Sequence, residues 1–145
     1  MLQVFVRRLI HAVDLPVYST PSSAGMDLFA AISGDETLMP GRRFLVPTGI
    51  EIELPEGFEA QVRSRSGLAY KEGLVVLNAP GTIDADYRGE IKVLIAHFGE
   101  KPFTIQRGFR IAQLVVTSHS RVEWKEIDAL SETKRQDKGF GSTGM

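Results

Sequence analysis

The sequence has no cysteine among its 145 residues and almost no net charge. The absence of cysteine excludes disulfide bonds, zinc sites built on thiolates and cysteine nucleophiles, and it is compatible with a reducing, cytoplasmic location. A formal net charge of −1 at pH 7 argues against a protein that coats nucleic acid or an anionic membrane, because both tasks need a basic field. A small polyanion is not excluded, since a local cluster of arginines is enough to bind one.

Long apolar runs are also missing. The N-terminal stretch MLQVFVRRLIHAV is interrupted by Arg7 and Arg8, where a signal peptide needs an unbroken apolar core. No run approaches the ~20 apolar residues of a membrane-spanning helix. With 43% hydrophobic and 24% charged residues, the composition is that of one globular domain with a sizeable core. We therefore expect a cytoplasmic domain with neither a membrane nor a nucleic acid as its partner.

Alternation of apolar and polar residues dominates the chain and predicts β-strands. The clearest case is TGIEIELP, where Ile50, Ile52 and Leu54 alternate with glutamates. Further strands are predicted over 58–64, 74–78, 90–98, 110–118 and 121–127, with one short helix over 66–73. Turn signals rich in proline and glycine separate these runs. Many short strands at this spacing predict an all-β fold, an antiparallel sandwich or barrel of jelly-roll type.

The last fifteen residues, SETKRQDKGFGSTGM, have a different composition. Phe140 is the one large apolar side chain before the final methionine, and it lies among glycines and small hydroxyl residues. Such a segment cannot pack as a strand or a helix, and its composition is typical of a disordered tail. We expect a β domain over residues 1–130 and a flexible, glycine-rich arm over residues 131–145.

The stretch GTIDADYRGE, at 81–90, has three acids and allows three interpretations. A calcium loop is excluded, because Arg88 stands at the fifth position of that pattern and Ile95 at the twelfth, where oxygen ligands belong. A general-base site and a hairpin held by ion pairs both remain open. In an extended segment Asp84 and Asp86 lie on one side and Tyr87 on the other. A turn would break that parity, so the sequence leaves open which aspartate faces a site.

Four other segments carry polar residues, each with an alternative explanation. AGMDLFAA places Asp27 in an apolar run, where a charge needs a task. RSGLA puts an arginine and a serine at the expected start of the helix, where backbone N–H groups suit an anion, although a helix cap explains the serine equally well. RIAQ places Arg110 and Gln113 in an apolar strand. GFGSTG offers consecutive backbone N–H groups and two hydroxyls to a phosphate, and Phe140 to a base.

Together and in this order, the five segments resemble the five motifs of the trimeric dUTP diphosphatases (dUTPases). AGMDLFAA is similar to the first motif, RSGLA to the second, NAPGTIDADYRGEI to the third, GFRIAQ to the fourth and KGFGSTG to the fifth. The resemblance extends from about Ala24 to Gly144. It implies a jelly-roll homotrimer with three active sites, each assembled from all three chains. Such an enzyme hydrolyses dUTP to dUMP and pyrophosphate, with Mg²⁺ bound mainly through the triphosphate, which limits uracil incorporation into DNA and supplies dUMP for thymidylate synthesis.

The resemblance also implies roles for individual residues. Asp84 matches the general base that activates the attacking water, and Tyr87 matches the ring that packs against the deoxyribose. Asp27 matches an acid that reaches the metal through water, so no direct protein ligand to the metal is expected. The other matches are nucleotide contacts: Asn78, Thr82, Ile83 and Lys92 for uracil, Arg65, Ser66, Gly67 and Gln113 for phosphates, and Arg135, Phe140, Gly141, Ser142 and Thr143 for the arm that closes over the nucleotide. Asp86, Glu90 and the three histidines are interpreted as structural.

The match has two departures, and two other functions remain open on the same fold. Gln136 and Lys138 stand where the fifth motif usually has glycine, and Phe109 stands where the fourth often has an acid. A dCTP deaminase would need a further acid–base residue at the cytosine amino group, and no residue of this sequence can be assigned to that role. A non-catalytic trimer that binds nucleotides is disfavoured by the intact Asp84 and the intact arm.

Overall fold

The computed structural model describes residues 2–137; Met1 and residues 138–145 lie outside the described part. The elements are β1 (Phe5–Arg8), β2 (Met26–Phe29), β3 (Glu36–Leu38), β4 (Arg43–Pro47), β5 (Ile50–Glu53), β6 (Phe58–Arg63), α1 (Ser66–Glu72), β7 (Leu74–Val76), β8 (Gly81–Ile83), β9 (Lys92–His97), β10 (Phe103–Ile105) and β11 (Arg110–Ser118). In this range, no helix has the length and apolar character needed to cross a membrane.

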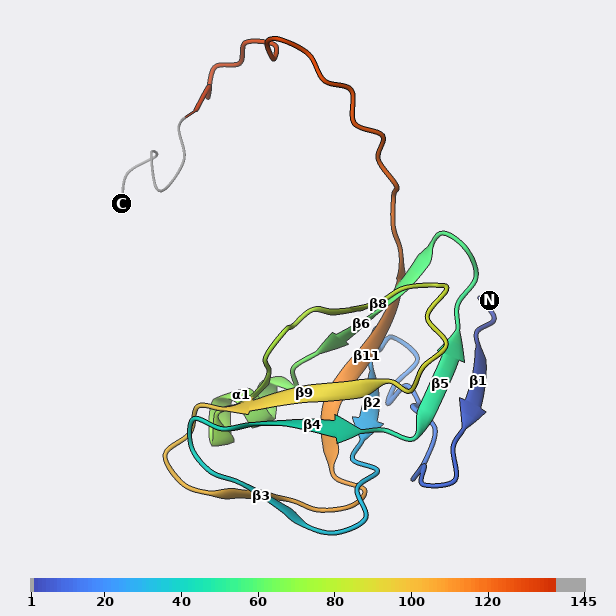
Figure 1. The fold of residues 1–145 in the computed structure, drawn as a ribbon, viewed down its shortest axis with the longest axis vertical. Coiled ribbons are helices and arrows are strands. Elements are labelled where there is room, and N and C mark those ends of the chain that lie inside the picture. The colour runs from blue at the N-terminus through green and yellow to red at the C-terminus, as the bar shows by residue number, and fades with distance from the viewer. Residues whose placement is uncertain (1, 138–145) are drawn as a thin grey trace.

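The strands pair in antiparallel fashion and form two main sheets. One has the order β2-β11-β6-β8 and the other the order β4-β9-β7, while the pairs β1-β5 and β10-β3 complete the framework. In Figure 1, β4 and β9 cross one side of the larger sheet and α1 lies at one end of it. The all-β architecture with a single short helix among residues 2–137 confirms the predicted jelly-roll type.

The core lies between the two main sheets and follows from the alternation in the sequence. In β5, Ile50 and Ile52 point inward and are buried, whereas Glu51 and Glu53 point away from the core. Val93 and Ile95 of β9 are buried in the same way, opposite Leu28, Val62, Ile111 and Leu114 of the larger sheet. Each such side chain contributes about 1.5–3 kcal/mol when it leaves water. This core is what makes the strand framework rigid enough to position a site.

The helix α1 is held at its C-terminal end. It ends at Gly73, which has a φ of 68°, a left-handed conformation that favours glycine. A Cβ at Gly73 would collide with the backbone of Gly99, and Phe98 N–H donates to the Gly73 carbonyl at 2.8 Å. The turn that follows β9 therefore anchors α1. Arg65 and Ser66, at the start of α1, come shortly after the end of β6, a strand of the larger sheet.

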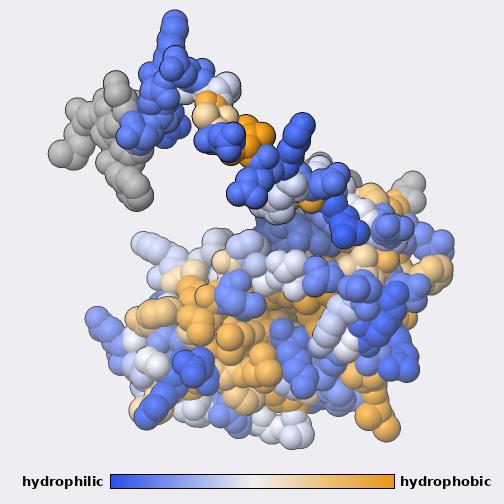
Figure 2. All heavy atoms as spheres, turned by 45° about the horizontal axis from the view of Figure 1, so that its top comes forward, coloured by the Kyte–Doolittle hydropathy of each residue, from blue (hydrophilic) through white to orange (hydrophobic). Residues whose placement is uncertain are grey.

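The strand predicted over residues 121–127 is wrong. The chain leaves β11 at Ser118 and has no strand over 119–137, and every residue of that range is exposed. Figures 1 and 2 show it running away from the strand framework. Val122 and Trp124 do alternate with charged residues, but a strand also needs a partner for its backbone N–H and C=O groups, and no strand within residues 2–137 pairs with this segment.

Candidate active site

A tight turn after β8 brings Asp84 and Tyr87 to the same side of the chain. Tyr87 N–H donates to the Asp84 carbonyl at 3.1 Å, and the Arg88 guanidinium donates to the carbonyls of Ala85 at 2.6 Å and Tyr87 at 3.1 Å. The turn breaks the two-residue alternation of an extended segment. Asp84 and Tyr87 consequently line one surface depression, of which Asp86 is not a part.

This depression, which we call the turn hollow, has a volume of about 390 Å³. Its lining consists of Leu45, Thr82, Ile83, Asp84, Tyr87, Glu90 and Lys92. Five of these were assigned to the base, sugar or catalytic water from the sequence, and Leu45 and Glu90 were not. A strand assigned to residues 43–47 would have identified Leu45 from the sequence. Phe44 and Val46 then face the core, and the apolar Leu45 side chain is left on the exposed face of β4.

Asn78 does not line the turn hollow, but it lies close to β8, the strand that carries Thr82 and Ile83. The residue is exposed, and a Cβ placed on Gly81 would lie 3.1 Å from the Asn78 amide nitrogen. Gly81 is the first residue of β8, and the chain reaches it through a cis peptide bond between Ala79 and Pro80. The Asn78 side chain therefore packs against the start of the strand that carries Thr82 and Ile83.

A second depression, the helix hollow, lies at α1 and has a volume of about 310 Å³. It is lined by Arg65, Ser66, Gly67, Leu68, Lys71, Glu72 and Gln113, which include all four residues assigned to phosphates outside the C-terminal arm. No side chain caps the start of α1, and its first turn has no acidic residue. Lys71 was missed, although its position four residues after Gly67 puts both on one face of a helix. The helix hollow thus combines two cations, a hydroxyl, an amide and one acid, Glu72.

Asp27 lies beside the helix hollow and is held by two arginines. Its side chain is 14% exposed, with one carboxylate oxygen 3.2 Å from Arg65 Nε and the other 3.6 Å from Arg110 Nη1. Arg65 also donates to the Arg110 carbonyl at 2.9 Å, and Gln113 stands opposite Asp27 in the β2–β11 register. These partners explain how an acid is tolerated in an apolar strand. Sequence reasoning did not assign Arg110 to the site.

Comparison with known proteins agrees with this constellation. The sequence model of the dUTPase family matches residues 11–144. The chain belongs to the dUTPase family. It is 52% identical to the deoxyuridine 5′-triphosphate nucleotidohydrolase of Anaplasma marginale (strain St. Maries), covering 99% of both chains. It is 57% identical to the protein of the same name from Rhizobium etli (strain CIAT 652), covering 92% of this chain and 86% of that one.

A solved structure shares the fold of this dUTPase. The dUTPase of Staphylococcus bacteriophage 80alpha, solved with dUPNHPP, superposes with a TM-score of 0.90 at 28% identity, covering 99% of both chains. The likeness therefore extends over nearly the whole length of both proteins. It supports the jelly-roll assignment independently of the strand pattern.

Phe109 stands where the fourth motif often has an acid, and its packing explains the difference. The Phe109 ring lies 5.5 Å from the Phe103 ring, centroid to centroid, at an interplanar angle of 59°. Such tilted aromatic pairs are favourable. Phe109 also packs against the buried core. The position thus contributes apolar contacts where the family often has a charge.

Metal coordination by protein side chains alone is not supported within residues 2–137. That part of the chain has no cluster of three or more histidines and acids that could hold an ion. Mg²⁺ characteristically keeps several waters and binds through one or two carboxylates together with substrate phosphates. Asp27 supplies one carboxylate beside the arginines of the helix hollow. The donor set fits a Mg²⁺ ion that arrives with a triphosphate.

The predicted arm is described only in part. Arg135 is exposed, and Gln136 N–H donates to the Thr133 hydroxyl at 3.1 Å. Gln136, at a position where the family usually has glycine, has a φ of 47°, in the left-handed region that glycine adopts at the lowest cost. The arm residues Phe140, Gly141, Ser142 and Thr143 lie outside the described residues, and so does Lys138.

Proposed function

We propose that this dUTPase hydrolyses dUTP to dUMP and pyrophosphate by direct attack of a water molecule on the triphosphate. The observation that carries the proposal is the exposed carboxylate of Asp84 in the turn hollow, beside Tyr87, within a chain that matches the family over 11–144. Asp84 accepts the proton of the water as it attacks, and the bond between the α-phosphorus and the bridging oxygen breaks to release pyrophosphate. No covalent intermediate on the protein is needed.

The nucleoside occupies the turn hollow in this proposal. Asn78 and the strand residues Thr82, Ile83 and Lys92 contact the uracil edge, and the Tyr87 ring packs against the deoxyribose. A flat ring at the sugar's C2′ leaves no room for a hydroxyl group, and a hydroxyl buried there without a partner would cost about 1–3 kcal/mol. The turn hollow would thereby distinguish dUTP from UTP.

The triphosphate occupies the helix hollow. Arg65, Ser66, Gly67 and Gln113, which line that hollow, bind its oxygens and neutralise its charge. Asp27 would hold Mg²⁺ through a water molecule, and the ion would supply further neutralisation of the phosphate charge. Catalysis then rests on positioning, one activated water and charge stabilisation.

The active unit is proposed to be a homotrimer whose sites combine residues of several chains. The two hollows of one chain share no lining residue, which supports a site that joins one chain's turn hollow to another's helix hollow. An apolar groove of about 440 Å³ on the β1–β5 side and the exposed Val122, Trp124, Ile127 and Leu130 also favour contacts between copies. Residues 131–145 form the arm that closes over the nucleotide, with Phe140 on uracil and Arg135, Gly141, Ser142 and Thr143 at the phosphates.

The test is release of pyrophosphate from a panel of nucleoside triphosphates. We expect dUTP to be hydrolysed with a kcat/KM far above those of UTP, dTTP and dCTP, and no ammonia to be released from dCTP. Ammonia release would identify a deaminase instead. Binding of dUTP without turnover in the presence of Mg²⁺ would identify a non-catalytic nucleotide-binding protein.

A further inference from the structure

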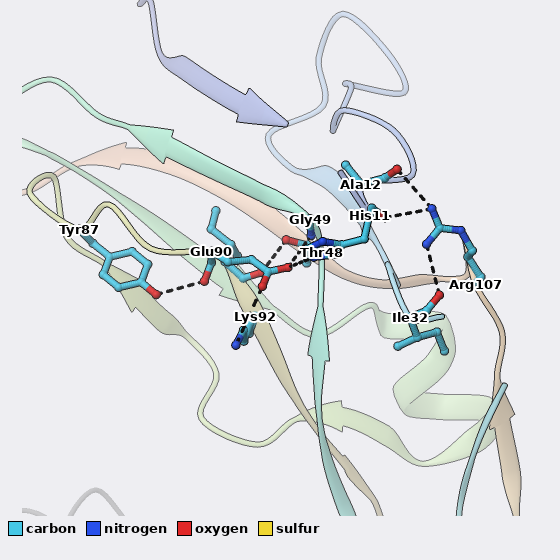
Figure 3. Close-up of polar contacts among 10 residues, drawn as sticks. His11, Ala12, Ile32, Thr48, Gly49, Tyr87, Glu90, Lys92 and Arg107 are labelled. Carbon is cyan, nitrogen blue, oxygen red and sulfur yellow. Dashed lines mark hydrogen bonds and ion pairs between the residues drawn. The ribbon is translucent and has the colours of Figure 1, made fainter. Parts of the chain in front are cut away.

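Glu90, which the family resemblance leaves without a role, has a partly buried carboxylate with two hydrogen-bond partners. Its side chain is 15% exposed, and one carboxylate oxygen accepts the Gly49 N–H at 2.8 Å and the His11 Nε2–H at 2.7 Å. Lys92 Nζ lies 4.0 Å from the other oxygen. Figure 3 shows His11 reaching Glu90 from a different part of the chain. One acid therefore joins three segments that are far apart in sequence.

The partners of Glu90 are themselves fixed. Gly49 has a φ of 72°, and any Cβ there would collide with Ala12, so the turn between β4 and β5 lies directly against the loop that carries His11. Leu9 N–H donates to the Gly49 carbonyl at 2.8 Å. The Arg107 guanidinium holds the same loop through the His11 carbonyl at 2.9 Å. The carboxylate of Glu90 is thus bound to a rigid support.

Two hydrogen bonds to the backbone of Ile91, the residue after Glu90, hold it against the same turn. The Thr48 hydroxyl donates to the Ile91 carbonyl at 2.5 Å, and Ile91 N–H donates to the Ile50 carbonyl at 2.9 Å. The backbone of residues 90–91 is therefore positioned by the β4–β5 turn on one side, and the carboxylate of Glu90 extends that attachment to His11 (Figure 3).

On its other side, the backbone of Glu90 contacts the Tyr87 ring. The Tyr87 hydroxyl donates to the Glu90 carbonyl at 3.1 Å, and a Cβ on Gly89 would lie 2.6 Å from Tyr87 Cζ, so the ring lies over the Gly89–Glu90 backbone. Tyr87 is 45% exposed. Because little core packing holds such a ring, its place depends on the hydroxyl bond and on where the Glu90 backbone lies.

We propose that Glu90, through His11 and the Gly49 amide, is a positioning residue that fixes the Tyr87 ring and so sets the preference for deoxyribose over ribose. The inference rests on the proposed function, in which the Tyr87 ring meets the sugar. The Tyr87 ring, packed against C2′, excludes a hydroxyl only while the ring cannot move away from the sugar. The carboxylate bonds to the Gly49 N–H and His11 hold the Glu90 backbone, and the Tyr87 hydroxyl is bonded to the carbonyl of that backbone.

The experiment compares kcat/KM for dUTP with kcat/KM for UTP in the wild type and in Glu90→Ala. The ratio of the two isolates the sugar, because both nucleotides carry the same triphosphate and use the same Asp84. We expect the ratio to fall on the order of tenfold in Glu90→Ala. The loss should come from a higher KM for dUTP and a faster reaction with UTP, with kcat for dUTP changed by less than about threefold. Tyr87→Ala, measured in parallel, shows how far the ratio falls when the ring itself is lost.

Two further variants separate positioning from mere support of the fold. Glu90→Gln keeps an oxygen for the Gly49 N–H and should retain most of the ratio, whereas His11→Ala should lower it in the same direction as Glu90→Ala but by less. The matched control is Glu51→Ala, whose carboxylate side chain is also 15% exposed and bound to a cation, Arg7, in β1. That variant should leave the ratio unchanged.

An unchanged ratio in Glu90→Ala, with dUTP and UTP reduced together, would overturn the inference while leaving the proposed function standing. If the wild type releases no pyrophosphate from dUTP, the proposed function fails and this inference with it. Should Glu90→Ala not fold, His11→Ala decides the matter, because it leaves the Gly49 bond in place. A lower ratio in that variant supports the inference, and a ratio equal to the wild type's contradicts it.

Discussion

The strand framework of residues 2–118, the body, and the exposed residues 119–137, the tail, have the same kind of sequence pattern and different structures. Ile50 and Ile52 alternate with glutamates in the body and form β5, while Val122 and Trp124 alternate with charged residues in the tail and form no strand. The pattern is local, but a strand needs a neighbour. Ile50 and Ile52 have the β1 strand beside them and a core beneath them, and Trp124 is 92% exposed.

The comparison extends to the proposed activity. Both hollows belong to the body, where strands and one anchored helix hold the side chains in place. The tail carries Arg135 and leads into the arm motif, and no core fixes it. We therefore expect chemistry to depend on the body and closure over the nucleotide to depend on the tail. The predictions below test this division, starting with the largest effect.

The largest effect is expected for Asp84→Asn. The amide keeps the shape of the side chain but cannot accept the proton of the attacking water, so kcat for dUTP should fall by ~10²–10⁴-fold. Nucleotide affinity, measured by calorimetry with a non-hydrolysable analogue, should stay close to that of the wild type. Asp86→Asn is the matched control, because Asp86 is exposed and does not line the turn hollow. Near-normal turnover in Asp84→Asn would exclude Asp84 as the base.

Truncation before Arg135 should lower kcat/KM for dUTP by ~10²-fold, because the closing arm is lost and the bound nucleotide is left poorly positioned. The body should keep its fold and its thermal unfolding temperature, since every described tail residue is exposed. Circular dichroism and calorimetry check the fold, and a pyrophosphate assay checks the activity. Normal hydrolysis by the truncated protein would show that the arm does not act as a lid.

Mixing the two variants tests whether sites combine different chains. Asp84→Asn and the truncated protein should each have little activity alone, whereas a mixed trimer can pair an intact Asp84 with an intact arm from another subunit. We expect a partial recovery of dUTP hydrolysis after subunit exchange. Exchange is proved beforehand with subunits labelled by two fluorophores. Complete exchange without recovery would count against arm donation between subunits.

Much of the body could be predicted from the sequence, because its elements carry a local signal and a partner. The strand expected over 110–118 matches β11, and the helix expected over 66–73 matches α1 to within one residue. Six strands, β1, β2, β3, β4, β8 and β10, were not identified. β1 is exposed along all four residues and therefore shows no apolar–polar alternation to read. Its pairing with β5 comes from the tertiary fold.

The candidate site also consists of residues that could be located from the sequence and residues that could not. The motif resemblance assigned Asp84, Thr82 and Lys92 to one site, and all three line the turn hollow. Two of the side chains that were missed, Arg110 and Glu90, meet their partners across large sequence separations. Arg110 meets Asp27 from a strand more than eighty residues away, and Glu90 meets His11 across a similar distance. No local pattern reports such contacts, because they exist only after the sheets have formed.

Truncating an apolar side chain should lower the free energy of unfolding much more in the body than in the tail. Ile95 is buried in β9, and Ile95→Ala should lower the free energy of unfolding by about 2–5 kcal/mol, through lost burial and the cavity left behind. Leu130→Ala removes an exposed side chain of the tail and should change it by less than ~0.5 kcal/mol in the dissociated chain. Urea unfolding at low protein concentration measures both. A large loss for Leu130→Ala would mean that the tail packs on the body.

The smallest effect concerns β1, which is as exposed as the tail yet forms a strand because it pairs with β5. Arg7 on β1 is hydrogen-bonded to Glu51 on β5, and this guanidinium holds the pKa of the Glu51 carboxyl below its usual value. A carboxyl whose pKa is lower in the folded state stabilises the protein at pH values above its unfolded pKa of ~4.3, and the contribution is lost as the pH falls through the folded pKa. Glu51→Gln should therefore lower the Tm at pH 7 by about 1–3 °C and have no effect once the pH lies below the folded pKa.

Glu53→Gln is the control, since its contact with Arg88 is longer, at 3.7 Å, and more exposed. The difference should shrink in high salt, because exposed charges are screened. An equal Tm loss at neutral and acid pH would show that Glu51 acts through packing, and β1 would then be held by its backbone pairing alone.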